Sequence, residues 1–251
     1  MHSRLPAMAL LAGGLATRMY PLTESVPKSL LRVDGEPFLA HQLRLLVERG
    51  IAEIVICCGH LGEQIEAYAG DGSRFGCRLR YSYDGDTLLG TGGALRRALP
   101  LLGESFLVMY GDSYLLADPA RVWKTFLAAG KPALMTVFRN DGKWDTSNIE
   151  MCNGQIVCYD KRVSRPDMRY IDYGLNILHR SVLKAWPENA PFDLATVMGG
   201  LASEGELAAH EVHGRFYEIG SPDGLSMTEQ MLASLRKSRE SELLSPMGCA
   251  P

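Results

Sequence analysis

Short runs of apolar residues alternate with segments of helical spacing along the first 140 residues of the chain. The runs have the length and largely apolar character of buried strands, and they cover residues 8–12, 54–58, 79–83, 106–110 and 133–138. Between them, apolar residues recur every three or four positions, as at Leu39, Leu43 and Leu46. This alternation predicts an α/β fold with a mostly parallel central sheet that carries helices on both faces.

The pattern changes after residue 140, where short strands predict a small antiparallel region. Residues 149–151 and 155–159 flank Asn153 and Gly154, which tolerate the positive φ angles of a type I′ hairpin turn. Residues 171–178 predict a further strand. We therefore expect the second part of the chain to add antiparallel strands and loops to the first.

Ser221, Pro222 and Asp223 predict the start of a C-terminal helix. They combine an N-cap residue, a proline that suits the first helical position and an acid in the first turn. The predicted organisation is a single domain that ends near residue 240, with two halves, a C-terminal helix and a flexible tail over residues 1–140, 141–220, 221–238 and 239–251.

The composition excludes several classes of protein. Of the 251 residues, 46% are apolar and 22% are charged, which allows a large core and excludes a mainly disordered chain. The 26 Lys and Arg residues against 29 Asp and Glu residues leave a formal charge of −3, without the basic excess of nucleic-acid-binding proteins. No apolar run reaches the roughly 20 residues that a membrane-spanning helix needs. We therefore expect neither a nucleic-acid partner nor a membrane partner.

The six cysteines contain no C-x-x-C pair. Their spacing indicates neither a zinc site nor a disulfide framework, so a reducing, cytoplasmic location is expected. Cys57 and Cys58 lie within the apolar run at residues 54–58, where thiols pack as small apolar groups. Residues 7–16 superficially match a short signal peptide, but two glycines interrupt them. A buried first strand that ends in a glycine turn explains the same residues better.

The segment after the first predicted strand carries candidate chemistry. Backbone N–H groups at Gly13 and Gly14 can approach phosphate oxygens closely because no side chain intervenes. Arg18 and Lys28 add positive charge downstream. The glycines alone are also compatible with an ordinary tight turn, and their spacing matches neither the dinucleotide-binding fingerprint nor a Walker loop. An NAD-dependent oxidoreductase is disfavoured for this reason.

Asp112 follows the predicted buried strand at residues 106–110. It lies at the carboxyl end of that strand, where open α/β sheets bind their ligands. An isolated Asp after a strand is more often a turn or cap residue. The residue type and its position leave both interpretations open.

Several motifs occur in order along the chain. They are Leu11-Ala12-Gly13-Gly14 with Thr17-Arg18, Pro21-Leu22-Thr23 and Pro27-Lys28, then Leu89-Gly90-Thr91-Gly92-Gly93-Ala94-Leu95, Gly111-Asp112, Asp160-Lys161 and Glu218-Ile219-Gly220-Ser221-Pro222. On these motifs the chain resembles the sugar-1-phosphate nucleotidylyltransferases, also called nucleotide-sugar pyrophosphorylases, over nearly its whole length. In its general pattern it is similar to short bacterial heptose or mannose 1-phosphate guanylyltransferases.

The resemblance implies a Rossmann-like fold whose first half binds a nucleotide. The glycine turn would wrap a nucleoside triphosphate, Arg18 would hold its β and γ phosphates, and Lys28 would contact phosphate near the reacting centre. Together with Asp112, these two residues are the implied catalytic residues. The implied nucleotide-binding residues are Leu11, Ala12, Gly13, Gly14, Thr17, Arg18, Lys28, Gly90, Thr91, Gly92 and Asp112.

The resemblance also implies a metal site and an acceptor site. Asp112 and Glu218 would hold Mg²⁺, which prefers carboxylate and phosphate oxygens, although the family more commonly has Asp at the second position. Asp172 also departs from the Asn of many relatives, and its carboxylate accepts hydrogen bonds but cannot donate them. The implied sugar-phosphate-binding residues are Glu150, Lys161, Asp172, Tyr173 and Gly174.

The activity implied by the resemblance is transfer of a nucleoside monophosphate from a nucleoside triphosphate to a sugar 1-phosphate, with Mg²⁺ as cofactor and pyrophosphate as product. GTP and a heptose or hexose 1-phosphate are the first expectation. UTP, CTP, dTTP and a non-sugar phosphate or phosphonate acceptor stay open. So does a regulatory relative that binds a nucleotide sugar without turnover, and so does assembly into a homo-oligomer.

Overall fold

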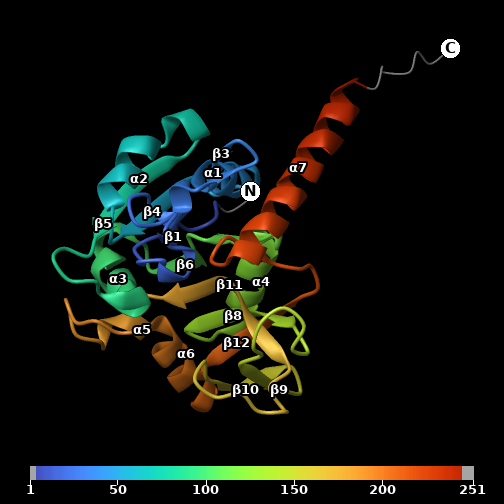
Figure 1. Cartoon of the computed structure of the whole chain (residues 1–251). Helices are drawn as coiled ribbons and strands as arrows, with labels where there is room; N and C mark the ends of the chain where they lie inside the picture. The colour runs from blue at the N-terminus through green and yellow to red at the C-terminus, as the bar shows by residue number, and fades with distance from the viewer. Residues whose placement is uncertain (1–3, 245–251) are drawn as a thin grey trace.

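The computed structural model describes residues 4–244. Within this range, nine strands form one central sheet (Figure 1). Its parallel part has the order β5-β4-β1-β6, with these strands at Arg78–Tyr83, Glu53–Cys58, Met8–Leu11 and Ser105–Tyr110. The sequence prediction of buried strands in the first half is therefore confirmed, including a buried first strand.

The antiparallel part of the sheet begins at β11 (Tyr170–His179), which runs antiparallel to β6. β8 (Ala133–Arg139) lies between β11 and β12 (Leu207–Val212). It runs antiparallel to β11 and parallel to β12. The hairpin of β9 (Ile149–Cys152) and β10 (Gln155–Tyr159) joins β11 at Tyr170. Asn153 and Gly154 have φ angles of 49° and 75°, which confirms the predicted hairpin turn.

Helices cover both faces of the sheet. One buried apolar cluster joins the sheet to α3 (Gly90–Ala98), α5 (Ser181–Lys184) and α6 (Leu194–Ser203). A second cluster lies on the opposite face of the sheet, because it contains the alternate side chains of β1 and β4. It joins the sheet to α1 (Phe38–Glu48), α2 (Gly62–Ala69) and α4 (Pro119–Ala129). Helix α2, helix α6 and strand β12 are elements that the apolar pattern did not predict.

Short elements complete the chain. Two small antiparallel sheets have two strands each. One is the hairpin of β2 (Arg32–Val33) and β3 (Glu36–Pro37), and the other pairs β7 (Ser113–Tyr114) with the distant β13 (Tyr217–Glu218). Four short 3₁₀ helices are described, at Thr17–Met19, Lys28–Leu30, Ser73–Phe75 and Leu99–Leu101.

Helix α7 (Pro222–Leu244) extends from one side of the body (Figure 1). Ser221 caps it, because its hydroxyl oxygen accepts a hydrogen bond of 3.0 Å from the Gly224 N–H. Leu232 packs in a third apolar cluster with Phe38 and Ile219. The helix continues past the predicted end at residue 238, and the last part of the predicted tail, residues 245–251, lies outside the described residues. None of the described helices is long and apolar enough to cross a membrane.

Cys57 and Cys58 are buried in β4, as their apolar context predicted. Burial raises the pKa of the Cys58 thiol to about 12. The cysteines among the described residues are free thiols, at positions 57, 58, 77, 152 and 158. Cys249 lies outside the described residues.

The turn after β1 packs against the end of β4, where Gly13 lies against Gly59. A Cβ atom on Gly13 would lie 2.8 Å from the backbone nitrogen of Gly59. A Cβ atom on Gly14 would meet nothing within 4 Å. Gly13 is therefore the glycine of this turn that the packing requires.

Gly13→Ala should lower the free energy of unfolding by about 1–3 kcal/mol, because the loop after β4 must move to admit the methyl group. Gly14→Ala is the matched control and should change it by less than about 0.5 kcal/mol. Urea denaturation followed by circular dichroism measures both. Equal stability of the two variants would contradict the packing role of Gly13.

Candidate active site

A cavity of about 250 Å³ lies at the carboxyl ends of the parallel strands. Its lining includes most of the residues predicted to bind a nucleotide, namely Leu11, Ala12, Gly13, Gly14, Lys28, Gly90, Thr91 and Asp112. Thr17, Arg18 and Gly92 lie outside this lining. The structure therefore brings together segments that are far apart in the sequence.

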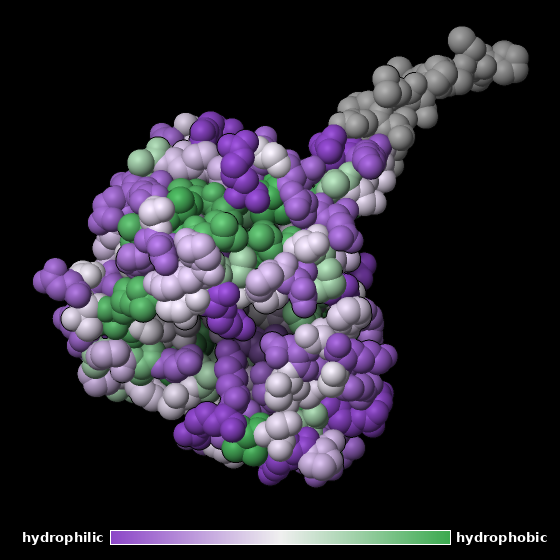
Figure 2. Space-filling view, viewed as in Figure 1, coloured by the Kyte–Doolittle hydropathy of each residue, from purple (hydrophilic) through white to green (hydrophobic). Residues whose placement is uncertain are grey.

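Exposed apolar side chains flank the glycine turn. Leu15 and Leu22 are 44% and 55% exposed, and Leu88, which lines the cavity, is 36% exposed. Figure 2 shows apolar side chains gathered in the upper half of this face, over the region where Figure 1 labels β4, β1 and α1. An apolar rim of this kind suits contact with a flat ring system.

Asp112 is fixed by the strands that precede and follow it. β6 ends at Tyr110, and the Gly111 N–H donates a hydrogen bond of 2.8 Å to the Leu11 carbonyl at the end of β1. The Asp112 carboxylate pairs with the Lys28 ammonium at 2.6 Å and accepts a hydrogen bond of 3.2 Å from the Ser113 hydroxyl. Asp112 and Lys28 thus form an ion pair in the wall of the cavity.

Glu218 reaches the same place through the β7–β13 pair, in which it lies opposite Ser113. A Cβ atom on Gly220 would lie 2.9 Å from Glu218 Oε2, 3.2 Å from Asp112 Oδ2 and 3.3 Å from Arg18 Nη2. Two carboxylates and one guanidinium from distant parts of the chain therefore converge at Gly220. The Asp112 backbone carbonyl accepts a hydrogen bond of 2.9 Å from the Ile219 N–H, which ties the two loops together.

The Glu218 carboxylate also holds the start of α7. It accepts hydrogen bonds from the Gly220 N–H and, at 2.6 Å, from the Ser221 hydroxyl. A Cβ atom on Gly224 would lie 1.7 Å from Glu218 Oε1, so a side chain there would displace the Glu218 carboxylate. The longer side chain of Glu, compared with Asp, folds back onto the helix and still keeps Oε2 near Asp112.

The donor set fits a hard divalent cation. Mg²⁺ is commonly held by one or two carboxylates, with phosphate oxygens and water as its other ligands. Asp112 Oδ2 and Glu218 Oε2, which face the same point, are such a pair. Residues 4–244 contain no group of three or more His, Cys, Asp or Glu side chains that could hold a metal ion.

Arg18 lies on an open turn. Ala16 adopts a left-handed conformation with a φ angle of 52°, and its carbonyl accepts a hydrogen bond of 2.9 Å from the Thr23 hydroxyl. Met19 is 2% exposed and anchors the turn in the core. Thr17 and Arg18 remain exposed. The turn after β1 is therefore accessible to a ligand.

The first turn of α3 is attached to the loop before α6. The Thr91 hydroxyl donates a hydrogen bond of 2.6 Å to Asp193 and accepts one of 2.8 Å from the Leu194 N–H. A Cβ atom on Gly92 would lie 2.3 Å from the Phe192 ring, so Gly92 serves close packing outside the cavity. Gly90, with a φ angle of 69°, lines the cavity together with Thr91.

Asp84 lines the cavity and was missed by the sequence analysis. It directly follows β5, is 6% exposed, and its Oδ2 accepts a hydrogen bond of 3.1 Å from the Leu89 N–H. Burial raises the pKa of its carboxyl group. Its position after a predicted strand, the same signal that identified Asp112, could have found it.

Some of the predicted sugar-phosphate residues gather around Tyr110, which lines the cavity. The Lys161 ammonium lies 5.4 Å from the centre of the Tyr110 ring. A Cβ atom on Gly174 would lie 3.6 Å from the same ring. Asp172 accepts hydrogen bonds from the Gly174 N–H at 2.9 Å and from the Asn176 amide at 3.3 Å.

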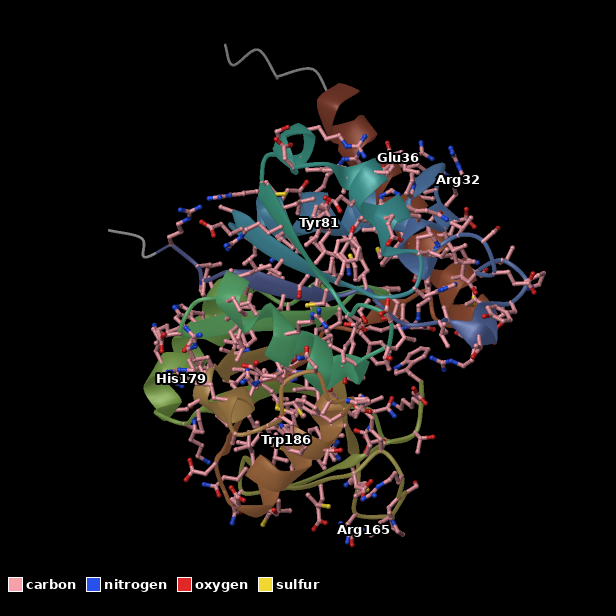
Figure 3. The ribbon with its side chains drawn as sticks, turned by 90° about the vertical axis from the view of Figure 1, so that its left-hand side faces the viewer. Arg32, Glu36, Tyr81, Arg165, His179 and Trp186 are labelled. Carbon is pink, nitrogen blue, oxygen red and sulfur yellow. The ribbon has the colours of Figure 1, made fainter. Side chains whose placement is uncertain are left out.

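Tyr173 and Glu150 do not join this group. Tyr173 is 2% exposed and belongs to the core cluster beneath the sheet, where its hydroxyl accepts a hydrogen bond of 3.2 Å from the Leu116 N–H. It faces away from Asp172 and Gly174 because neighbouring residues in a strand alternate in direction. Glu150 pairs with Arg165 at 3.1 Å. Arg165 lies at the end of the molecule opposite Arg32 and Glu36 (Figure 3).

Burial raises the pKa of Asp172 above the ordinary value of 3.8. The folded state therefore retains this proton to a higher pH than the unfolded state. The contribution of Asp172 to the free energy of unfolding of the wild type consequently falls as the pH rises above 3.8. Asp172→Asn cannot ionise. We expect its free energy of unfolding, relative to the wild type, to increase between pH 4 and pH 7.

Urea denaturation at the two pH values tests this. Asp141→Asn is the matched control, because the hydrogen bond from Arg169 lowers the pKa of Asp141. Its stability relative to the wild type should therefore change in the opposite direction. A constant difference between Asp172→Asn and the wild type would show that Asp172 ionises normally.

Comparison with known families gives a match over much of the chain. The family model described as nucleotidyl transferase matches residues 8–147. An N-acetylmuramate alpha-1-phosphate uridylyltransferase from Neisseria meningitidis is 46% identical over 104 residues, which are 41% of this chain and 45% of that protein. A mannose-1-phosphate guanyltransferase beta-A from Xenopus laevis is 29% identical over 239 residues, which cover 91% of this chain and 65% of that protein.

Solved structures show the same fold. A Bacillus anthracis protein crystallised with sucrose, and assigned as a glucose-1-phosphate thymidylyltransferase, superposes with a TM-score of 0.80 at 21% identity, over 90% of this chain and 94% of that one. This likeness confirms the α/β architecture with a mostly parallel sheet. The chain spans only about half the length of the first curated relatives that it matches, at 45% and 52%.

Proposed function

Because this chain belongs to the nucleotidyl transferase family, we propose that it transfers a nucleoside monophosphate from a nucleoside triphosphate to a sugar 1-phosphate and releases pyrophosphate. The observation that carries this proposal is the convergence of Asp112, Glu218 and Arg18 at Gly220, beside a cavity that begins at a glycine turn. In this proposal residues 1–140 bind the nucleotide and residues 141–220 bind the acceptor.

The reaction needs charge neutralisation and positioning more than proton transfer. A phosphate oxygen of the acceptor forms a bond to the α-phosphorus, and the bond from that phosphorus to the leaving pyrophosphate breaks. The acceptor phosphate is already an anion, so no general base is needed. Phosphoryl-type transfers of this kind depend on alignment and on electrostatic stabilisation.

The chain's own side chains would supply these effects. Arg18 and the backbone N–H groups of the turn at Gly13 and Gly14 would hold the triphosphate. Lys28, already in the cavity wall, would neutralise charge near the α-phosphate, and Lys161, above Tyr110, would receive the acceptor phosphate. Asp112 and Glu218 would hold Mg²⁺, which neutralises phosphate charge when bound.

Asp112→Asn should lower kcat by on the order of 100-fold or more, because it removes a negative charge from the cation site. A pyrophosphate-release assay with Mg²⁺, each of the common nucleoside triphosphates and a panel of hexose and heptose 1-phosphates measures this. EDTA should stop the wild-type reaction. Asp71→Asn, at a turn outside the cavity, is the control and should keep full turnover.

Circular dichroism should show that Asp112→Asn remains folded. Turnover near the wild-type level in this variant would remove Asp112 from the proposed site. Binding of nucleotide by the wild type without any turnover over the whole panel would instead favour a regulatory protein.

For the nucleobase we propose guanine, on the observation that the Asp84 carboxylate lines the cavity. An ionised carboxylate only accepts hydrogen bonds. Guanine presents two adjacent donors, the ring N–H and the exocyclic amine, whereas uracil and thymine flank one N–H with two carbonyl acceptors. A carboxylate therefore pairs with guanine and repels the pyrimidine carbonyls. Asp84 also accepts a hydrogen bond from the Leu89 N–H, directly before Gly90 and Thr91, which are expected to bind the nucleotide.

UTP is the second candidate, because the relative with 46% identity is named as a uridylyltransferase. Asp84→Asn decides between them, since the amide keeps one acceptor oxygen for the Leu89 N–H but adds a donor. The ratio of kcat/KM for GTP to that for UTP should exceed one in the wild type and should fall about 10-fold or more in the variant. A wild-type preference for UTP, or an unchanged ratio in the variant, would contradict the guanine proposal and leave nucleotidyl transfer intact.

A further inference from the structure

Gln42 is a fully buried polar residue on α1 whose side chain reaches the loop of Asp112. It is 0% exposed. Its amide nitrogen donates a hydrogen bond of 2.9 Å to the Tyr110 carbonyl and one of 2.7 Å to the Ser113 carbonyl. These two carbonyls stand on either side of Gly111 and Asp112. One side chain thus clamps both ends of the segment that presents the Asp112 carboxylate.

The clamp comes from a rigid part of the molecule. Leu39 and Leu43 are 0% exposed and hold α1 against the sheet. The segment that receives the clamp contains Gly111, which has no Cβ atom to restrict its backbone. Two further backbone hydrogen bonds hold this segment: the Gly111 N–H donates one of 2.8 Å to the Leu11 carbonyl, and the Asp112 carbonyl accepts one of 2.9 Å from the Ile219 N–H.

The amide oxygen of Gln42 has no hydrogen-bond partner among the described residues, although it is buried. An unpartnered buried acceptor destabilises the folded state. The glutamine therefore has a cost to the fold that an apolar side chain of similar length would avoid. Methionine has that length and would leave no unpartnered oxygen. The two hydrogen bonds to the Tyr110 and Ser113 carbonyls are therefore the interactions that favour glutamine at this position.

We propose that Gln42 is a positioning residue, which sets the Asp112 carboxylate at the distance from Glu218 that one divalent cation requires. The proposal rests on the proposed function, because it assumes a cation between these carboxylates and a triphosphate. Gln42 touches neither substrate nor cation. It acts through the backbone of residues 110–113. Loss of the clamp lets the carboxylate sample orientations that no longer face Glu218.

Gln42→Met tests the proposal, with Leu46→Val as the matched control. Both sites lie buried on α1, and Leu46 packs in the core without a hydrogen bond to the Asp112 loop. Electron paramagnetic resonance would follow Mn²⁺ binding to each protein in the presence of GTP, at a temperature where circular dichroism shows every variant folded. Gln42→Met should bind the Mn²⁺–GTP complex about 10-fold more weakly than the wild type, and Leu46→Val should bind it equally well.

Turnover gives a second measurement. The Mg²⁺ concentration for half-maximal activity should rise about 10-fold in Gln42→Met, while the KM for the acceptor stays within about twofold. Gln42→Asn, one methylene too short to reach both carbonyls, should show the same shift and serves if the methionine variant does not fold. In an Asp112→Asn background, Gln42→Met should cause no further loss of Mn²⁺ binding, because its effect passes through Asp112.

The two proposals fail in different ways. If the wild type neither binds Mn²⁺ with a nucleoside triphosphate nor turns over, the proposed function is overturned. If the wild type does both and Gln42→Met matches Leu46→Val in Mn²⁺ binding and Mg²⁺ dependence, the positioning role is overturned alone. An equal loss in Gln42→Met and Leu46→Val would assign Gln42 to stability and would also overturn it.

Discussion

The parallel pairing of β1 with β4 and β6 is the constraint on which the candidate site depends. Leu11, the last residue of β1, lies opposite Cys57 on one side and Tyr110 on the other. Parallel strands end at the same edge of a sheet, so the turn after β1 and the loop after β6 leave it side by side. Glycines permit the close approach, at Gly13 against β4 and at Gly111 against the Leu11 carbonyl. Apolar strands thereby place polar loops together.

A second constraint couples the two carboxylates of Asp112 and Glu218 to the C-terminal helix. The Glu218 carboxylate both faces Asp112 and accepts hydrogen bonds from the Gly220 N–H and the Ser221 hydroxyl at the start of α7. A negative charge at a helix N-terminus is favourable, so this arrangement stabilises α7 as well as presenting an oxygen to the site. The position of the helix and the position of this oxygen are therefore linked.

Tyr110 forms the wall shared by the two halves of the chain. It lines the cavity, and burial together with the charge of Asp172 raises the pKa of its phenol far above the ordinary value. Its ring is therefore neutral and offers a face to the Lys161 ammonium. The antiparallel pairing of β11 with β6 brings Gly174 to the same ring. In the proposed reaction, a nucleotide and an acceptor bound on the two sides of Tyr110 would approach each other at Asp112.

Local sequence pattern was sufficient for much of the fold. The five apolar runs of the first half became strands, the Asn153-Gly154 turn has positive φ angles, and Ser221 caps a helix. These features depend on residues within one turn or one strand of each other. Helix α6 and edge strand β12 escaped prediction, because small residues at Gly199 and Gly200 and the polar His210 and Glu211 weaken their periodicity.

The sequence by itself determined the polar groups available to a site and the ends of strands at which they emerge. Only the tertiary structure decided which of them meet. The family resemblance led us to expect Glu218 beside Asp112, but the structure alone brought Asp84 into the cavity wall, joined Gln42 to the loop of Asp112 and turned Tyr173 into the core. The reason is that spacing along a chain records local backbone geometry. Pairing between strands that lie a hundred residues apart depends on how whole apolar faces pack, and no local pattern contains that information.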